Sequence, residues 1–447
     1  MKQMPHQDKC ILHADIEGKN KAEFAVELSK NVKSQLSKKK AVALESICFP
    51  MDFELYSVFS ILAGRTSLET LSIYGCKISN SMKIDNMEIG ELILESNLGK
   101  KLDLDSLELD RLLVVDNQLE RFELSQSKIE QLVFISYTSA IAKQPEMGIV
   151  FLALNEITNF QISNQVFSLL HITGSTIHGT LTVNNLKTDG LLIRDSAFLM
   201  LVNLTEIISK KYFALPRCVI DKPRLFTISR SDLSRSGFKE TNVAEINFID
   251  NIWRKKRQKS IKILDHCFAD ESESLQIIKG PYGKVSLNQC LETYRQLKVN
   301  FEKKGDYVDG GEFHYCEMEM CRLLNRQLSL YSIYKFLSGY GERPSKAIVV
   351  FLVVLFSLSF LHLLIGFDVG NKNINYDIIQ IISMKSVSIN DIINSIHLTF
   401  SNLTLRNLGS IGLSVNILNT PLWIFETIFG PLQIGLIALA MRRKIRR

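Results

Sequence analysis

The sequence predicts a multidomain protein made of a β-solenoid, a helical hairpin and a membrane module with two apolar helices. Three observations carry this prediction. Short apolar pairs recur every 20 or 21 residues, two helical patterns flank a glycine turn, and two long apolar runs lie near the C-terminal end. The expected parts are an N-terminal cap region (1–65), the solenoid (66–253), a linker (254–284), the hairpin (285–345) and the membrane module (346–447).

The membrane module is predicted from its two apolar runs, 347–367 and 421–441. The first holds 21 residues without a formal charge, and a helix of that length covers about 31 Å, which matches the hydrocarbon core of a bilayer. A core helix of a soluble protein is rarely apolar on every face over such a length. The piece between the runs, 389–412, is too short and too polar to span, so we expect it to be re-entrant.

The flanking charges and the N-terminal sequence predict the topology. Arg343 and Lys346 precede the first run, and RRKIRR follows the second. Positively charged flanks favour the cytosolic side, so both ends are expected in the cytosol. The N-terminus shows no apolar run after its basic residues, so we expect no signal peptide and a cytosolic body.

Bulk composition narrows the classes of partner and cofactor. The net charge is +6, and RRKIRR alone supplies five positive charges, so we expect no nucleic acid partner. All eight cysteines precede the first apolar run and are expected to be free thiols in a reducing compartment. The spacing of His314, Cys316 and Cys321 does not fit a zinc site. We therefore expect neither a metal nor a cofactor.

The solenoid is predicted from apolar pairs with period 2, which indicate short strands. One set follows a step of 20 or 21 residues and a second set lies at half that step, so each coil should hold two strands. A leucine-rich repeat would need a helical return and a fixed Asn or Cys, and the sequence has neither. A right-handed β-helix of the pentapeptide-repeat kind fits better, although its five-residue sub-period is degenerate here. The two sets are Leu71-x-Ile73, Leu92-x-Leu94, Leu112-x-Val114 and Leu132-x-Phe134, with Met82-x-Ile84, Leu102-x-Leu104 and Phe122-x-Leu124.

The segment after the solenoid changes to helical patterns. The basic run that follows Trp253 reads as a solvated linker rather than as a lipid or nucleic acid patch. A helix over 290–304 is expected to end at Gly305, and a second helix to run over 310–337. Ser338 to Pro344 should break that helix just before the first apolar run, so the hairpin is expected to form a collar at the membrane surface.

The segment between the two apolar runs shows the order of elements that is typical of a pore, namely a short helix followed by a loop. Residues 389–401 can form a short helix capped by Ser388 or Asn390, followed by a loop whose carbonyls face an ion. Arg406 near the axis would repel cations; turned outward it could pair with Glu426, the carboxylate of the second run. Alternatively, Glu426 lies near the headgroups. Gly430 precedes Pro431 and marks a gating hinge or a plain packing kink. The candidate filter residues are Thr404, Leu405, Arg406, Asn407, Leu408, Gly409, Ser410 and Gly412.

Several phrases resemble a known group of proteins. YRQLKVNFEKKGDYVDGGEFHYCEMEMCR, SGYGERPSKA and GPLQIGLIALAMRRKIRR are similar to bacterial pentapeptide-repeat membrane proteins with a C-terminal two-span, ion-channel-like pore module. The resemblance covers about 225–447 and implies a multi-pass protein of the bacterial inner membrane that forms a homotetramer. The filter departs from that group, because Arg406-Asn407 replaces two threonines and Ser410-Ile411-Gly412 replaces Tyr-Gly-Asp. Both changes argue against ordinary potassium selectivity.

The sequence therefore predicts an ion-channel-like integral membrane protein that conducts an inorganic ion of unknown identity. Its cytosolic solenoid would act as a binding or sensing domain, with a cytosolic protein as a partner. The alternative is a non-conducting, membrane-anchored scaffold that uses the solenoid for protein interaction. An enzyme is not expected, because the sequence shows no nucleophile–base set, phosphate loop or metal-ligand spacing.

Overall fold

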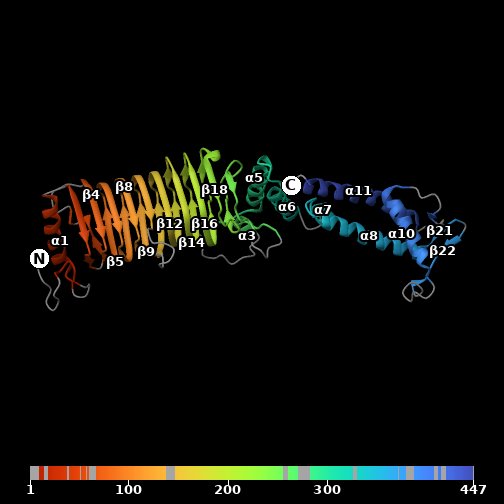
Figure 1. The fold of residues 1–447 in the computed structure, drawn as a ribbon, viewed down its shortest axis with the longest axis horizontal. Coiled ribbons are helices and arrows are strands. Elements are labelled where there is room, and N and C mark those ends of the chain that lie inside the picture. The colour runs from red at the N-terminus through yellow and green to blue at the C-terminus, as the bar shows by residue number, and fades with distance from the viewer. Residues whose placement is uncertain are drawn as a thin grey trace. The chain divides into compact units, whose positions relative to one another are not determined.

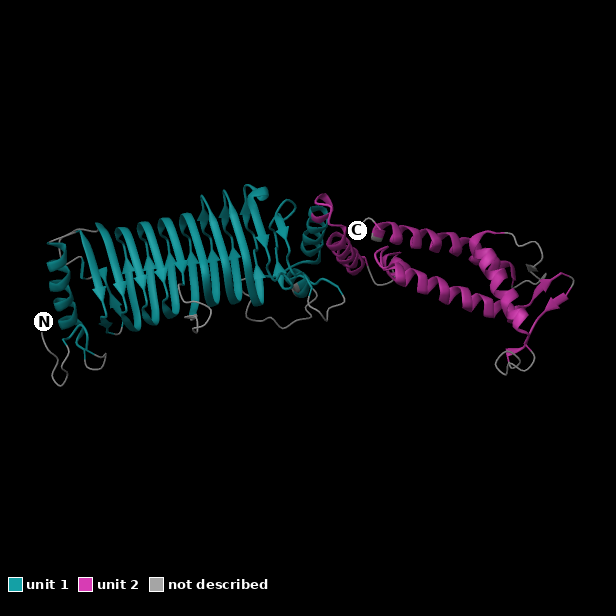
Figure 2. Ribbon diagram, viewed as in Figure 1, with its two compact units in different colours: residues 1–300 teal, residues 301–447 magenta. Residues whose placement is uncertain are grey.

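The computed structural model divides the chain into two compact units, residues 1–300 and residues 301–447 (Figure 2). Each unit is described by itself. The described residues are 10–14, 19–37, 40–50, 52–56, 58–59, 67–136, 146–254, 260–269, 282–325, 330–370, 372–378, 387–406, 411–413 and 419–445.

Unit 1 is a parallel β-solenoid of about eight turns (Figure 1). Each strand pairs with the strand one coil further along, and Leu71, Leu92, Leu112 and Leu132 stack in register as predicted. Its strands are β1 (Ala41–Glu45), β2 (Cys48–Phe49), β3 (Phe53–Glu54), β4 (Ser67–Tyr74), β5 (Lys77–Asp85), β6 (Glu88–Glu95), β7 (Leu98–Asp105), β8 (Glu108–Val115), β9 (Gln118–Ser125), β10 (Lys128–Ile135), β11 (Glu146–Ala153), β12 (Glu156–Thr173), β13 (Thr176–Ile177), β14 (Leu181–Arg194), β15 (Ala197–Phe198), β16 (Val202–Ala214), β17 (Val219–Ile220), β18 (Phe226–Ser229), β19 (Ser236–Gly237) and β20 (Asn247–Ile249).

The solenoid core combines stacked apolar side chains with a buried ladder of asparagines. The predicted pairs point inward and are almost fully buried. The Asn117 Oδ1 atom accepts hydrogen bonds from the backbone N–H (3.0 Å) and the side-chain amide (2.9 Å) of Asn97, while Asn117 donates to the Leu94 carbonyl at 2.7 Å. The residue before each of these asparagines, Ser96 or Asp116, has a positive φ. Side-chain amides thus bond to carbonyls and N–H groups at the corner of the coils, where buried polar groups need partners.

The solenoid begins earlier than the predicted residue 66. Strand β1 pairs in parallel with β4, and Val42 and Leu44 continue the inward apolar pattern. Helix α1 (Lys21–Leu36) packs over this first coil, with the Phe24 ring 5.2 Å from the Phe53 ring in an edge-on contact. A helix therefore covers the open end of the stack, where apolar groups would otherwise be exposed.

The other end of the solenoid is covered by helix α5 (Leu287–Lys303). The side-chain amide of Asn300 donates to the carbonyls of Val243 and Ile246, at 2.7 and 2.8 Å. The predicted linker contributes to this end as well: it contains helix α3 (Leu264–Ala269), and Ile261 and Ile263 are buried. These apolar side chains pack instead of remaining solvated.

Asp265 of α3 is a buried carboxylate in this packed end. Its carboxylate accepts hydrogen bonds from the Tyr282 hydroxyl and from the Phe238 backbone N–H (2.9 Å). Burial raises the pKa of the Asp265 carboxyl from 3.8 to about 6, although both hydrogen bonds favour the charged form. At neutral pH, ionisation of the Asp265 carboxyl therefore lowers the stability of the folded protein.

We expect Asp265→Asn to change how stability depends on pH. Because the folded pKa is raised, wild-type stabilisation is complete below about pH 4 and is lost as the pH rises through 6, by about 3 kcal/mol in total. The asparagine variant lacks this loss, so the wild type should lose stability relative to the variant between pH 4 and 7. Thermal unfolding of the detergent-solubilised proteins measures the difference. Parallel pH profiles would contradict the argument.

Unit 2 holds helices and one small sheet. Its elements are α6 (Tyr307–Leu324), α7 (Leu330–Ser338), α8 (Pro344–Ile365), α10 (Ile389–Thr404), α11 (Asn419–Ile445), β21 (Phe367–Val369), β22 (Lys372–Ile374) and β23 (Ile411–Leu413). The second hairpin helix, predicted over 310–337, ends at Leu324 because Asn325 closes it: its backbone N–H and side-chain amide both donate to the Cys321 carbonyl. The predicted break before the first apolar run is confirmed, since residues 339–341 all have positive φ.

Candidate functional site between the apolar helices

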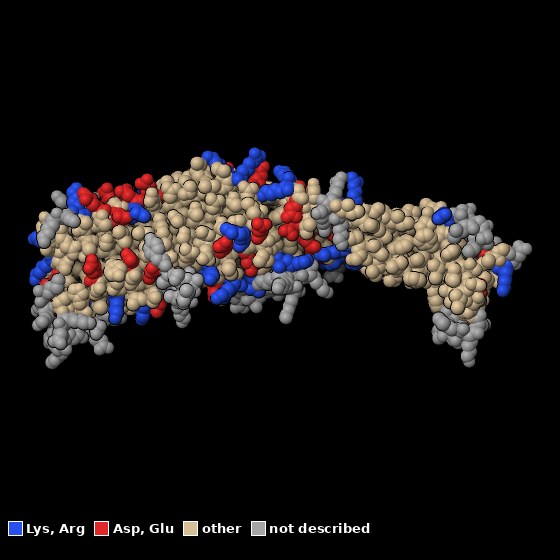
Figure 3. Space-filling view, viewed as in Figure 1, with Lys and Arg blue, Asp and Glu red and all other residues tan. Residues whose placement is uncertain are grey.

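Helices α8 and α11 are each long and apolar enough to span a membrane. Their apolar residues are not confined to a core: Val353, Phe356, Trp423 and Ile428 are all exposed in the single chain. Figure 3 shows that this part of the surface carries few charged side chains. An apolar surface of this extent on a monomer marks a face that meets lipid or another protein.

Helix α10 packs against both α8 and α11. Ser388 caps its N-terminus, as predicted, by accepting a hydrogen bond from the Asn390 backbone N–H. The hydroxyls of Ser395 and Thr399 are buried and donate to carbonyls of their own helix. Small residues with internally bonded hydroxyls allow close helix packing without leaving a buried polar group unpaired.

A buried polar cluster joins the three helices. The Glu426 carboxylate on α11 lies 2.8 Å from His362 Nε2 on α8, and its other oxygen accepts a 2.6 Å hydrogen bond from the Asn402 amide on α10. Glu426 and His362 are fully buried, and Asn402 is half-buried. Among the described residues, His362 Nδ1 has no hydrogen-bond partner. One carboxylate therefore fixes three helices against each other.

The expected pairing of Glu426 with Arg406 is wrong. Both carboxylate oxygens are already engaged by His362 and Asn402, and the Arg406 side chain is exposed. The depth of Glu426 relative to the lipid headgroups stays a prediction, because burial among the helices does not fix it. A buried carboxylate takes the nearest donors on the facing helices, and Arg406 follows the end of α10.

The partner of Glu426 was missed at the level of the sequence, although a signal for it exists. Phe367 and Pro421 are the facing ends of the two apolar runs, and His362 and Glu426 each lie five residues inside them. In two antiparallel helices, equal distances from facing ends give equal depth. Polar residues inside apolar spans are rarely left unpaired, so the two residues could have been matched.

The other candidate filter residues lie in different environments. Thr404 is the last residue of α10, and Leu405 follows it as the C-cap with φ 56°. Gly412 lies in β23, opposite Asp368 of β21. Asn407, Leu408, Gly409 and Ser410 lie outside the described residues. The described part of the predicted loop thus continues α10 at one end and joins a three-stranded sheet at the other.

Gly430 marks a close approach of α10 to α11. A β-carbon at this position would overlap the carbonyl group of Leu403, a fully buried residue near the C-terminal end of α10. Glycine is therefore required here for packing, whatever its role as a hinge. Elsewhere on α11, a β-carbon at Gly435 would meet no atom within 4 Å.

Fold and site together define a class: a β-solenoid protein with a C-terminal bundle of two candidate membrane-spanning helices and a shorter helix between them. No family model, curated protein or solved structure matches the chain. Within the described part of the chain, no group of three or more His, Cys, Asp and Glu side chains could hold a metal ion.

We expect the buried pair to respond non-additively to substitution. His362→Leu leaves the Glu426 carboxylate with one partner and should lower the free energy of unfolding by about 3–5 kcal/mol. The double variant His362→Leu/Glu426→Leu removes the buried charge and should be more stable than His362→Leu alone. Thermal unfolding in detergent compares the two. A double variant that loses the sum of both single effects would contradict the pairing.

A glycine pair on α11 provides a matched test of the packing. Gly430→Ala should destabilise the protein by about 1–3 kcal/mol, because the backbone of Leu403 has no room to move away. Gly435→Ala adds the same methyl group to an open position and should stabilise by up to about 1 kcal/mol through helix propensity. Equal melting temperatures for the two variants would show that Leu403 does not pack against Gly430.

Proposed function

We propose that this protein is an ion-channel-like integral membrane protein, in which unit 2 forms the pore and the solenoid is a binding or sensing domain. The arrangement of α10 supports this most strongly. It has 16 residues and covers about 24 Å, which is too short to span a hydrocarbon core of about 30 Å. Its C-terminal end contacts Gly430, which lies 11 residues after the start of α11, or about 16 Å along that helix. A re-entrant helix that ends at mid-depth has this geometry.

One copy of this helix arrangement does not enclose a pore, so the proposal includes a homo-oligomer with four-fold symmetry. The oligomer would lie in the bacterial inner membrane, with both termini in the cytosol. The C-terminal end of α10 carries the partial negative charge of the helix dipole, which attracts cations at the centre of an assembly. Arg406 follows the C-cap residue Leu405 and is exposed. We propose that the positive charge of Arg406 sets the selectivity of the pore between cations and anions. The solenoid would be a right-handed β-helix of the pentapeptide-repeat kind.

One observation favours a second function, that of a non-conducting scaffold anchored in the membrane. Gly412, the last residue of the predicted filter, lies in β23 and is paired with Asp368. Backbone carbonyls that belong to a β-ladder cannot all face an ion. In this case the apolar helices hold the solenoid at the membrane, where it binds a protein partner.

A flux assay with the purified protein in liposomes distinguishes the two functions. We expect the wild type to carry current in KCl gradients, and Arg406→Gln to shift the reversal potential toward that of the cation, because a positive charge beside the path repels cations. Arg442→Gln removes the same charge at the far end of α11 and should leave the reversal potential unchanged. Absence of conductance in KCl, NaCl and chloride gradients would reject the pore and leave the scaffold.

A further inference from the structure

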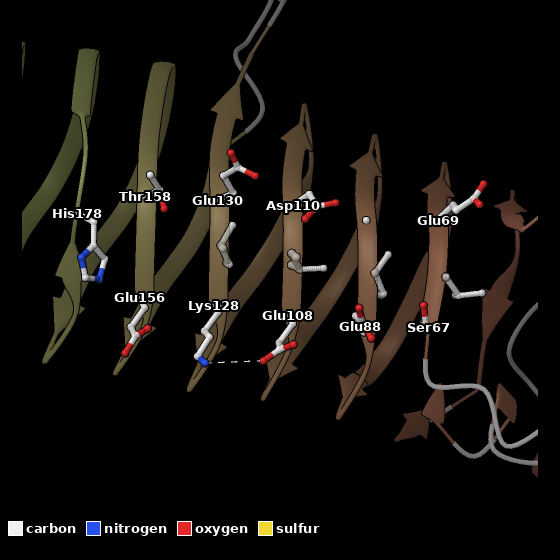
Figure 4. Close-up of a pocket in the computed structure, with 15 residues that line it drawn as sticks. Ser67, Glu69, Glu88, Glu108, Asp110, Lys128, Glu130, Glu156, Thr158 and His178 are labelled. Atoms are coloured by element: carbon white, nitrogen blue, oxygen red, sulfur yellow. Dashed lines mark ion pairs between the residues drawn. The ribbon is translucent and has the colours of Figure 1, made fainter.

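A groove runs along one face of the solenoid, across the strands β4, β6, β8, β10 and β12. It encloses about 570 Å³ and lies between two rows of outward side chains (Figure 4). The parallel register places Glu88, Glu108, Lys128 and Glu156 one above the other in the first row. The second row holds Glu69, Asp110, Glu130, Thr158 and His178.

The floor between the rows is formed by the residues that lie between the two outward positions of each strand. It consists of Leu68, Ile89, Leu109 and Ile129, whose side chains point into the core and are at most 7% exposed. In the second row, Gly90 occupies the position between Glu69 and Asp110, so this position carries no side chain. A β-carbon at Gly90 would lie 2.7 Å from the Glu69 carbonyl oxygen.

The groove carries an excess of negative charge. Six of its side chains are carboxylates and one is a lysine. Lys128 lies 3.9 Å from Glu108, and Glu69 is bridged by Lys40 at 3.4 Å. Among the described residues the other four carboxylates form no ion pair. Glu88 is stacked directly on Glu108 at the spacing of neighbouring strands, about 4.8 Å, which destabilises the folded chain.

On the other side of the coil, stacked carboxylates have a cation beside them: Asp103 is stacked on Glu123, and Lys101 lies 3.2 Å from Asp103. Arg111 lies 3.1 Å from Glu91, one residue beyond the groove on the same strands, and Lys101 lies 2.6 Å from Glu123 on the other side of the coil. Uncompensated carboxylates therefore gather where the surface is hollowed. A concave, unpaired, negatively charged surface is complementary to a basic partner.

We infer that this groove binds an extended polypeptide segment rich in lysine and arginine from a partner protein. Six coils at about 4.8 Å give a length of about 24 Å, which matches about seven extended residues. Successive side chains of an extended chain point to opposite sides, so neighbouring basic residues would reach the two acidic rows in turn. This inference does not depend on whether unit 2 conducts ions.

The test uses the full-length protein in a neutral detergent and a fluorescein-labelled heptalysine peptide, followed by fluorescence anisotropy. The groove variant Glu108→Gln/Asp110→Asn/Glu130→Gln should bind about tenfold more weakly than the wild type in 50 mM KCl. The control variant Glu45→Gln/Glu120→Gln/Asp221→Asn loses three exposed carboxylates outside the groove and should stay within about twofold. The groove variant should melt no earlier than the wild type, because like-charge repulsion is removed.

Two results would overturn the inference. Equal weakening in both triple variants would show that the peptide responds to net charge and not to the groove. Complete displacement of the peptide by spermine, at equal concentrations of positive charge, would assign the groove to a small polycation. Peptide binding that is lost in the groove variant, kept in the control variant and resistant to spermine supports the inference.

Discussion

The buried carboxylate of Glu426 sets the packing of the apolar helices. A charge that is removed from water must find donors within the protein, and here the donors come from two other helices, through His362 and Asn402. Gly430 lies one turn further along the same face of α11 and admits the backbone of Leu403. A small rotation of α11 would separate both contacts at once. The depth and orientation of α10 are thus fixed by one hydrogen-bonded charge and one missing side chain.

In the solenoid, the governing constraint is the parallel register. Every position is stacked on its equivalent one coil away, so any property of a residue is repeated along a column. Leucine columns fill the core, and Asn97 and Asn117 bond to each other along the corner. The same stacking acts on the outside, where a column of carboxylates cannot avoid its own repulsion unless a cation intervenes. Among the described residues, Lys128 provides such a cation for Glu108, whereas Glu88 forms no ion pair.

The repeats, the helix break before the first apolar run and the Ser388 cap could be predicted because each depends on residues close in sequence. Missed features depend on distant contacts. Val42-x-Leu44 shows the same pattern as later coils, but a single pair is too weak a signal to extend the solenoid to β1. Asn325 was expected within a helix, since helical periodicity continues across it. Helical periodicity does not identify the partner of Glu426, whereas the equal distances of His362 and Glu426 from the facing ends of the two apolar runs do.

Because Glu426 is already engaged, the charge of Arg406 needs another explanation. Arg406 follows the αL residue Leu405 at the end of α10, and among the described residues its guanidinium forms no ion pair. If α10 ends at mid-depth, an unpaired guanidinium in contact with lipid there would be costly. Partial negative charge at the helix C-terminus offsets only a part of that cost. The remaining stabilisation must come from water or from a neighbouring copy of the chain. A hydrated space bounded by several copies would provide both, so the position of Arg406 connects the proposed re-entrant helix with the proposed oligomer.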